Sequence, residues 1–307
     1  MEDTRRIAVA PVGTRPWLVE AVRAGGAQVV PPEEAEALVW TAVADPDGLQ
    51  ATLATAPTVR WVQLPWAGIE TYVEAGVLDP AYTWTSGKGV YAQPVAEHAL
   101  ALGLAGLRDL KRFATARGWG EQSGISLAGG KVTIFGGGGI TQELVKLLTP
   151  FRCSITVVRR SSEPLAGTDR VLGFQERYEA LKGADLVVLA LALTPETHSL
   201  IGEIELELME PHAWLVNVAR GEHVVTDELV AALREDIIGG AALDVTAPEP
   251  LPAGHPLWDL PNCLVTPHTG NTEDMAKPLL AARITENVRR FAAGEELIGL
   301  VDVERGY

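Results

Sequence analysis

The sequence predicts an α/β protein with two doubly wound, Rossmann-like parallel sheets, each in its own domain. Three observations support this fold class. The chain has 307 residues, which is more than a single domain usually holds. Short apolar runs alternate with amphipathic stretches, as is typical of parallel strands joined by helices. A strand, four glycines and a helix follow one another in residues 131–148, as expected where a nucleotide-binding sheet begins.

The first series of strands and helices runs from Arg5 to about Thr85. Short apolar runs bounded by turn residues predict strands, and apolar residues at helical spacing predict helices. The expected strands are Ile7–Ala10, Ala37–Trp40 and Val59–Gln63, and the expected helices are Trp17–Ala24 and Asp47–Ala54. This order predicts a β/α domain around a parallel sheet.

A single long helix is expected from Pro94 to Arg117. Proline is tolerated in a first helical turn because the N–H that it lacks has no partner there. The apolar residues at helical spacing are Val95, Ala99, Leu102, Ala105 and Leu110. We interpret this helix as the element that joins the two domains.

The second series extends to about Thr266. Its expected strands are Val132–Phe135, Ile155–Val158, Leu186–Leu191, Trp214–Val218, Ala241–Val245 and Cys263–Thr266. Thr226 is expected to cap one intervening helix, and a final helix is expected from Glu273 to Ala293, ended by Gly294. We therefore expect two domains, one of residues 1–93 and 271–307 and the other of residues 94–270, and the second has the profile of a dinucleotide-binding domain.

The formal net charge of −15 limits the classes of partner. Nucleic acids and anionic membranes are bound mainly through Lys and Arg, so a strongly acidic protein repels both. The same field repels a small anionic substrate, so a site for one must carry its own positive charge. We expect an arginine in a cleft.

Cysteine and histidine usage predicts neither disulfides nor a metal site. Cys153 and Cys263 lie in apolar stretches that read as strands, where a buried thiol is usual. No two histidines have HExxH spacing. Residues Met1 to Arg6 are charged and do not resemble a secretion signal, and no apolar run approaches the ~20 residues that span a bilayer. The sequence thus favours a cytoplasmic protein.

The glycine-rich segment reads KVTIFGGGGITQELVKLL. Gly136 and Gly138 fit the first two positions of GxGxxG, which allow a tight turn and the close approach of a pyrophosphate. Gly139 and Ile140 would offer their N–H groups to it. The third position is Thr141, which predicts a slightly wider packing or a shifted phosphate. A plain flexible turn is the alternative, but the place between a strand and a helix favours a dinucleotide.

The end of the next strand bears on the choice of cofactor. A site for NAD places an acidic residue there, which binds the ribose 2′-hydroxyl. Here Arg159, Arg160 and Ser161 follow the strand, and two guanidinium groups suit a 2′-phosphate. We therefore expect NADP(H) as the preferred cofactor, with NAD(H) as the second choice. Two solvated surface arginines are the alternative.

Three later segments carry candidate catalytic residues. They read LVNVARGEHVVTDELVAAL from Leu215, AALDVTAPEPLPAGHPLW from Ala241 and NCLVTPHTG from Asn262. In this order they resemble the D-isomer-specific 2-hydroxyacid dehydrogenase family, in its glyoxylate and hydroxypyruvate reductase type. LTPETHSLIG, PVAEHALAL and LPWAGIE extend the similarity to roughly residues 64–307. The resemblance implies a flavodoxin-like substrate domain beside a nucleotide-binding domain.

Arg220, Glu249 and His268 are the expected catalytic residues. Reduction of a 2-keto acid needs a cation that holds the carboxylate and polarises the carbonyl, and Arg220 offers a planar pair of donors. His268 would give a proton to the carbonyl oxygen in reduction and accept one in oxidation. Glu249 would accept a hydrogen bond from the imidazole, which orients it and favours its protonated form.

The resemblance also implies which residues line the cofactor and the substrate. The cofactor-lining positions are Leu191, Ala192, Thr197, Val218, Ala219, Arg220, Asp244 and His268. Among them, Asp244 resembles the family's contact to the nicotinamide carboxamide, and Ala192 stands where the family usually has proline. The N–H groups of Ala67 and Gly68 would hold the substrate carboxylate. Trp66 would either shape the pocket or serve in aromatic packing.

The sequence therefore predicts an NADPH-dependent reductase of small 2-keto acids such as glyoxylate or hydroxypyruvate. A short phosphoglycerate dehydrogenase is an alternative in the same family, whereas a formate dehydrogenase would have glutamine in place of Glu249. An alternative from another class is a nucleotide-sensing binding protein of the corepressor type, which shares the fold and these residues. The resemblance also implies a homodimer built around the helix near residues 94–117.

Overall fold

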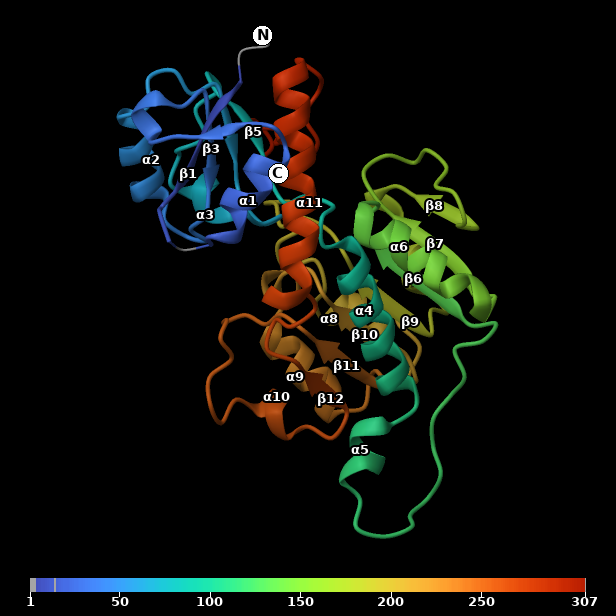
Figure 1. Ribbon diagram of the computed structural model, residues 1–307. Helices are drawn as coiled ribbons and strands as arrows, with labels where there is room; N and C mark the ends of the chain where they lie inside the picture. The colour runs from blue at the N-terminus through green and yellow to red at the C-terminus, as the bar shows by residue number, and fades with distance from the viewer. Residues whose placement is uncertain (1–3, 14, 307) are drawn as a thin grey trace. The chain divides into compact units, whose positions relative to one another are not determined.

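The computed structural model describes residues 4–13 and 15–306. It divides into two compact units: unit 1 is Met1–Tyr91 with Thr272–Tyr307, and unit 2 is Ala92–Asn271. Each unit contains one all-parallel sheet, which confirms the predicted fold class (Figure 1). The assignment of substrate to unit 1 and of dinucleotide to unit 2 stays a prediction. Residues 1–3, which belong to the segment from Met1 to Arg6 that does not resemble a secretion signal, lie outside the described residues.

Unit 1 contains a five-stranded sheet in the order β2–β1–β3–β4–β5. Its strands are β1 (Arg6–Ala10), β2 (Gln28–Val29), β3 (Ala37–Trp40), β4 (Trp61–Gln63) and β5 (Thr83–Thr85). Its helices are α1 (Trp17–Ala24), α2 (Pro46–Ala54), α3 (Glu70–Glu74) and α11 (Glu273–Ala293), with a 3-10 turn, η1 (Pro32–Glu34). This strand order is the flavodoxin-like one, and it reverses between β1 and β3.

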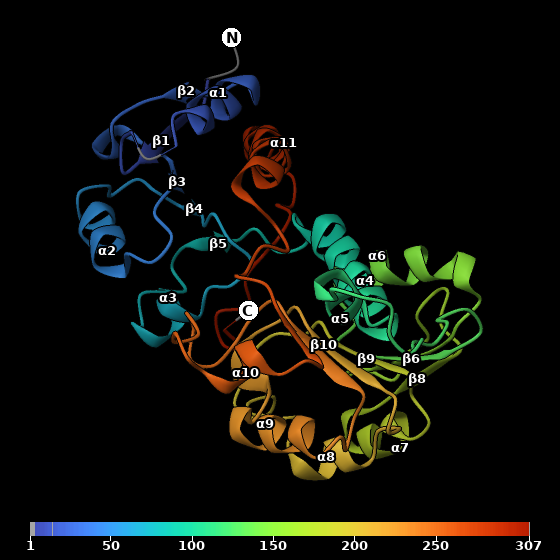
Figure 2. The same ribbon diagram turned by 90° about the horizontal axis from the view of Figure 1, so that it is seen from below.

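Helices cover both faces of the unit 1 sheet (Figure 2). All four residues of β3 are buried, as expected of a central parallel strand. Leu49 of α2 and Tyr72 of α3 join one apolar cluster with the strands, while α1 packs with α11. The indole N–H of Trp40 donates to the Tyr72 hydroxyl at 3.0 Å, so this core satisfies its polar groups internally.

Unit 2 contains a seven-stranded sheet in the order β12–β11–β10–β9–β6–β7–β8. Its strands are β6 (Lys131–Phe135), β7 (Ser154–Val158), β8 (Arg170–Leu172), β9 (Leu186–Leu189), β10 (Trp214–Asn217), β11 (Gly240–Leu243) and β12 (Cys263–Val265). Its helices are α4 (Ala92–Leu107), α5 (Leu110–Thr115), α6 (Gly139–Leu148), α7 (Arg177–Leu181), α8 (Glu203–Glu207), α9 (Thr226–Arg234) and α10 (Pro256–Asp259), with 3-10 turns η2 (Thr149–Phe151), η3 (Phe174–Glu176) and η4 (Gly221–His223).

Helices cover both faces of the unit 2 sheet (Figure 2). An apolar cluster lies on each face, between the helices and the strands. One includes Leu102 of α4 and Leu144 of α6, and the other includes Leu206 of α8 and Leu229 of α9. The strand order reverses between β6 and β9. Doubly wound sheets bind their ligands at such a switch point, outside the carboxyl ends of the strands.

The single helix predicted for residues 94–117 is wrong: the structure has two helices, α4 and α5. Asp109 lies between them with φ of 53°, in the left-handed region where a helix cannot continue. Within α4, a Cβ at Gly106 would lie 2.2 Å from the Trp214 ring, so glycine allows the helix to pack closely on β10. The expected cap at Thr226 is also wrong. Val225 is the N-cap, and the Thr226 hydroxyl donates to the carbonyl oxygen of Ala247 at 2.7 Å.

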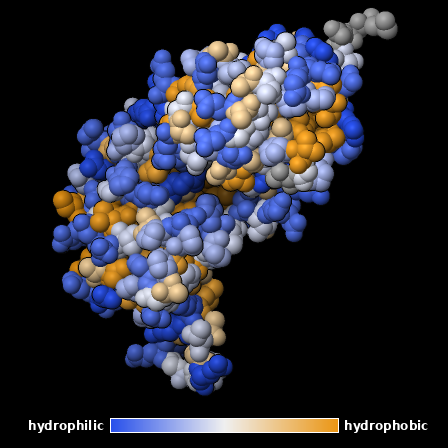
Figure 3. Space-filling view, turned by 90° about the vertical axis from the view of Figure 1, so that its left-hand side faces the viewer, coloured by the Kyte–Doolittle hydropathy of each residue, from blue (hydrophilic) through white to orange (hydrophobic). Residues whose placement is uncertain are grey.

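The exposed surface is polar, as expected of a chain with a formal net charge of −15. The face shown in Figure 3 is mostly hydrophilic, with smaller hydrophobic patches between charged side chains. Among the described residues, none of the helices combines the length and the apolar character that a bilayer requires. Cys263 is buried in β12 as expected, whereas Cys153 is only half-buried and lies just before β7.

Candidate active site

The residues predicted to serve catalysis and cofactor binding in unit 2 all follow the carboxyl ends of its strands. The segments are 136–140 after β6, 159–161 after β7, 191–197 after β9, 218–220 after β10, 244–249 after β11 and His268 after β12. Since all seven strands are parallel, these ends share one edge of the sheet. We call this the unit 2 edge.

The glycine loop leaves open space at the start of α6. Gly136 has φ of 106°, and a Cβ there would lie 2.1 Å from the Ala190 carbonyl oxygen, so only glycine fits. Gly138 is the N-cap of α6, and a Cβ at Gly138 would meet no atom within 4 Å. The first N–H groups of this ten-residue helix therefore border open space at Gly138, as an anion-binding helix start requires.

Thr141, at the third position of the glycine pattern, is fully buried in α6. Its hydroxyl donates to the carbonyl oxygen of Gly136 at 3.0 Å. The threonine thus ties the helix to the turn through a hydrogen bond, where a glycine would leave only close packing.

Arg159, the first residue after β7, leaves a donor for an anion. Arg159 is half-buried, and its Nη2 donates to the carbonyl oxygen of Glu163 at 2.6 Å. Its buried Nε has no hydrogen-bond partner among the described residues. Arg160 is exposed, and its charge helps to lower the pKa of Glu196, chiefly set by a hydrogen bond from Thr194. An unpartnered N–H and a nearby guanidinium fit a phosphate-bearing cofactor.

The predicted cofactor loop after β9 is held by a buried histidine. Nδ1 of His223 lies 2.8 Å from the carbonyl oxygen of Thr197, and Nε2 lies 3.4 Å from that of Leu191. Burial lowers the pKa of His223. The Thr197 hydroxyl donates to the carbonyl oxygen of Ala192 at 2.8 Å. The loop is therefore held both by a hydrogen bond within it and by its contacts with His223.

The backbone around Arg220 is fixed on both sides. Asn217 is buried, donates to the carbonyl oxygen of Arg220 at 2.8 Å and accepts from the N–H of Ala219 at 3.0 Å. A Cβ at Gly221 would lie 2.0 Å from the Thr246 carbonyl carbon, so the residue after Arg220 must be glycine. Val218 and Ala219, both predicted cofactor contacts, are buried beside it.

His268 and Glu249 form a direct pair: His268 Nδ1 lies 2.7 Å from Glu249 Oε1. Their side chains are 53% and 43% exposed, so the pair can be reached from outside unit 2. His268 has φ of 53°, uncommon for a residue other than glycine. Its N–H donates to the carbonyl oxygen of Asp244 at 2.8 Å. Arg220 follows β10, the strand next to β11, so three adjacent strands carry the predicted catalytic residues.

Asp244 fixes the turn that carries His268. One carboxylate oxygen accepts from the Thr266 hydroxyl at 2.6 Å and the Thr269 N–H at 2.8 Å, and the other accepts from the Gly270 N–H at 2.9 Å. His98 Nε2 lies 3.2 Å away. Burial raises the pKa of Asp244, but these hydrogen bonds outweigh it and lower the pKa to about 2. The contact of Asp244 with a carboxamide stays a prediction. Protein donors already bind both oxygens, so a carboxamide would have to share them.

The predicted carboxylate loop, residues 66–68, follows β4 in unit 1. The Gly87 N–H donates to the Trp66 carbonyl oxygen at 2.9 Å, and the Trp66 and Tyr91 rings lie 5.2 Å apart. Burial raises the pKa of Tyr91, whose hydroxyl donates to the carbonyl oxygen of Pro65 at 2.7 Å. No described residue accepts from the N–H of Ala67 or Gly68. The loop is thus held firmly, with two donors to offer.

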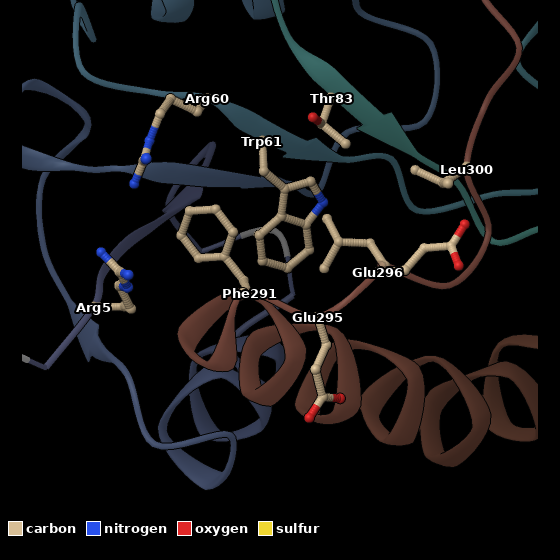
Figure 4. Close-up of a pocket in the computed structure, with 10 residues that line it drawn as sticks. Arg5, Arg60, Trp61, Thr83, Phe291, Glu295, Glu296 and Leu300 are labelled. Carbon is tan, nitrogen blue, oxygen red and sulfur yellow. The ribbon is translucent and has the colours of Figure 1, made fainter. Parts of the chain in front are cut away.

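A separate cleft of about 460 Å³ lies elsewhere in unit 1 (Figure 4). Phe291 of α11 packs against Trp61 with ring centres 5.2 Å apart, and it faces the guanidinium groups of Arg5 and Arg60. Both arginines pair with Glu36, at 3.1 and 3.3 Å. None of the predicted site residues lines this cleft, so it does not belong to the candidate active site.

Two histidines at the unit 2 edge, His98 and His223, were assigned no role from the sequence. His98 contacts the Thr266 hydroxyl at 3.1 Å, but nothing in a long apolar helix indicates this contact. His223 stands three residues after Arg220 within the same motif, which is the one signal that could have revealed it. In residues 4–13 and 15–306, no group of three or more His, Cys, Asp or Glu could hold a metal ion.

Comparisons with known proteins agree with this geometry. Residues 99–270 match the family model described as D-isomer specific 2-hydroxyacid dehydrogenase, NAD binding domain. Glyoxylate reductase of Pyrococcus furiosus is 34% identical over 268 residues, 83% of this chain and 79% of that protein. An uncharacterized protein of Corynebacterium melassecola is 38% identical over 255 residues, 81% of this chain and 84% of that protein. The crystal structure of a D-isomer specific 2-hydroxyacid dehydrogenase from Xanthobacter autotrophicus Py2, in complex with NADPH and MES, aligns with a TM-score of 0.85 at 28% identity and covers 99% of both chains.

Proposed function

Since the chain belongs to the D-isomer specific 2-hydroxyacid dehydrogenase family and is therefore an NAD(P)-dependent oxidoreductase, we propose that it reduces small 2-keto acids with NADPH. Glyoxylate and hydroxypyruvate are the first candidate substrates. The observation that carries the proposal is the pairing of His268 with Glu249 at 2.7 Å. Glu249 follows β11 and His268 follows β12, and β11 is the neighbour of β10, which Arg220 follows. These three side chains match the needs of carbonyl reduction.

The proposed roles of the catalytic residues follow from their atoms. The nicotinamide, when bound, would supply the hydride for the carbonyl carbon, so this chain's residues must supply the one proton that the carbonyl oxygen needs to become a hydroxyl. Because His268 Nδ1 faces Glu249, its Nε2 is the nitrogen that gives this proton. Arg220 holds the carboxylate and polarises the carbonyl through its paired donors. Glu249 keeps the imidazole oriented for both directions of the reaction.

The proposed cofactor site lies between the glycine loop and the loops after β7, β9 and β10. Gly136, Gly138, Gly139 and Ile140 would take the pyrophosphate, supported by the open space at the start of α6. The unpartnered Nε of Arg159 supports a 2′-phosphate, with Arg160 and Ser161 beside it, and hence NADP(H) over NAD(H). The remaining proposed contacts are Leu191, Ala192, Thr197, Val218, Ala219, Arg220, Asp244 and His268.

The proposed grip on the substrate carboxylate uses the backbone of unit 1. The N–H groups of Ala67 and Gly68 have no acceptor among the described residues, and oriented N–H groups of this kind bind anions. The Trp66 ring packs on the Tyr91 ring and thereby holds the loop in place. This contact supports a packing role for Trp66, and a role in shaping the substrate pocket is the alternative.

The proposed partner is a second copy of this chain. α5 and the segment of residues 116–127 extend away from the unit 2 sheet (Figure 1). Along this arm Leu110 and Phe113 are 52% and 39% exposed, and Trp119 is fully exposed. Exposed apolar side chains on a projecting arm are typical of a surface that another chain covers. Sedimentation velocity of the wild type and Trp119→Ala tests this: a dimer that dissociates in the variant is expected.

The cysteines support a reducing compartment. Both Cys153 and Cys263 are free thiols. Burial raises the pKa of Cys263 to about 12 and also raises that of Cys153, so neither is a ready nucleophile. We therefore keep a cytoplasmic location as a proposal.

A substrate panel tests the proposed function. Loss of nicotinamide absorbance is followed with NADPH and glyoxylate, hydroxypyruvate and related 2-keto acids. Turnover with at least one of them is expected. NADPH binding without turnover of any 2-keto acid would instead support a nucleotide-sensing binding protein. Oxidation of 3-phosphoglycerate without turnover of glyoxylate, hydroxypyruvate or any other 2-keto acid that lacks a phosphate would support the phosphoglycerate dehydrogenase alternative.

A further inference from the structure

The loop after β1 places a second cation beside the carboxylate loop of unit 1. The Arg15 guanidinium carbon lies 4.9 Å from the centre of the Trp66 ring. Nη1 of Arg15 donates to the carbonyl oxygen of Thr41 at 3.0 Å. Thr41 is fully buried, and its hydroxyl donates to the carbonyl oxygen of Pro11 at 3.0 Å. An indole face and the protein backbone therefore hold this guanidinium in place.

Arg15 lies where the unit 1 sheet is expected to bind a ligand. Arg15 follows the end of β1, Thr41 follows β3, and Trp66 follows β4. These three strands are neighbours, and the strand order reverses between β1 and β3. Parallel doubly wound sheets bind ligands at this point, outside the carboxyl ends of their strands. Neighbouring parallel strand ends thus bring together a cation, an aromatic ring and the carboxylate loop.

The charge of Arg15 is not compensated within the described residues. None of their carboxylates forms an ion pair with it, whereas Arg5, Arg23 and Arg60 are all paired. In a chain with a net charge of −15, acidic partners are plentiful. The Arg15 guanidinium has no acidic partner among the described residues and lies where the strand order reverses, so it is suited to bind an anion from outside the chain.

The proposed substrate already uses its own 2-carboxylate elsewhere, on the N–H groups of Ala67 and Gly68. A different anionic group is needed to pair with Arg15. We infer that the preferred substrate is a 2-keto acid with a second anionic group on its distal carbon, and that Arg15 binds this group while lying on Trp66. This inference rests on the proposed function. The planar stacking on Trp66 keeps the remaining donors of Arg15 oriented.

Two matched substrate pairs test the inference on the full chain with NADPH. Pyruvate and oxaloacetate differ by a distal carboxylate, and hydroxypyruvate and 3-phosphohydroxypyruvate differ by a distal phosphate. In the wild type, kcat/KM is expected to be about 10- to 100-fold higher for the charged member of at least one pair, as one charge-assisted contact predicts. The pair that shows the larger ratio identifies the distal group.

Variants of Arg15 then show whether this residue produces the preference. Arg15→Gln is expected to remove most of the 10- to 100-fold advantage while kcat/KM for the uncharged member stays essentially unchanged. Arg15→Lys keeps the positive charge but lacks the planar pair of donors, so it should retain part of the preference for the charged substrate. Arg23→Gln in α1 is the matched control, because this exposed arginine pairs only with Glu20. Turnover of the uncharged substrate reports that each variant is folded.

The outcomes separate the inference from the proposed function. Equal kcat/KM within both pairs in the wild type overturns the inference alone. An equal fall for charged and uncharged substrates in Arg15→Gln also overturns it, since Arg15 would then serve only to hold Trp66. No turnover of any 2-keto acid by the wild type overturns the proposed function itself.

Discussion

The carboxyl edges of the two sheets are built differently. At the unit 2 edge the polar groups that follow β11 and β12 satisfy one another: Asp244 accepts several hydrogen bonds, and His268 faces Glu249 at 2.7 Å. At the unit 1 edge the N–H groups of Ala67 and Gly68 have no acceptor among the described residues. Unit 2 therefore holds a prearranged set of reacting groups, whereas unit 1 holds donors that a ligand must complete.

Because of this difference, substitutions at the two edges should change different kinetic constants. A group fixed in place before substrate arrives lowers the barrier of the chemical step, so its loss reduces kcat. A donor that gains its partner only from the substrate contributes binding, so its loss raises KM or changes selectivity. Substitutions at the unit 2 edge should therefore act on kcat or on the cofactor, and those at the unit 1 edge on the choice of substrate.

The pairing of Glu249 with His268 should carry the largest effect after that of His268 itself. Glu249→Gln keeps the size of the side chain but removes the charge that orients the imidazole. We expect kcat for glyoxylate to fall about 100-fold, at the low end of general acid–base effects, with little change in KM. Steady-state kinetics with NADPH measures both. If Glu249→Gln changed KM alone, Glu249 would act in binding, which would contradict the proposed difference between the two edges.

Arg159 should decide between the two nicotinamide cofactors. Arg159→Asp removes a donor for a 2′-phosphate and adds an acid that can bind a ribose 2′-hydroxyl. The ratio of kcat/KM for NADPH to that for NADH should fall about 10- to 100-fold, as for the loss of a charge-assisted hydrogen bond. Arg170→Asp, which replaces an exposed arginine of β8, is the control. A wild-type preference for NADH, or an unchanged ratio, contradicts the NADP(H) proposal.

Asp244 should make the His268 turn sensitive to acid. Its pKa in the folded protein, about 2, lies below the ordinary value of 3.8, so its ionised form stabilises the folded state at higher pH. This contribution is lost as the pH falls from about 4 to about 2. Asp244→Asn should cost about 2 kcal/mol of unfolding free energy at neutral pH, and the difference from wild type should shrink over that window. Urea unfolding at several pH values measures it, and a difference independent of pH would contradict this role.

His223 should have the smallest effect, because it acts through the cofactor loop. His223→Gln can keep one of the two contacts to the carbonyl oxygens of Thr197 and Leu191. We expect KM for NADPH to rise about fivefold, the equivalent of one neutral hydrogen bond, with kcat little changed. His212→Gln, an exposed histidine paired with Asp185, is the control. If only thermal stability changes, His223 serves the fold and not the cofactor loop.

Local patterns in the sequence were sufficient for the sheets and for the order of the site. Buried parallel strands need short apolar runs, so β3 and helix α1 could be predicted with their observed ends. The left-handed backbone at Asp109, which ends α4, could not be predicted from the sequence. Aspartate is common both in the first turns of helices and in loops, so its presence does not indicate where a helix ends. Contacts such as that between His98 and Thr266 join residues 168 positions apart, and no local pattern reports them.

Proton transfer by His268 is the step on which the proposed reaction depends most. His268→Gln should lower kcat for glyoxylate about 100- to 10,000-fold, the range of general acid catalysis by a positioned side chain. The Kd for NADPH, measured by fluorescence in the absence of substrate, should change far less than kcat, because His268 is one of many proposed cofactor contacts. A variant that keeps wild-type kcat, or one whose lost activity is explained by lost NADPH binding, would contradict the central claim.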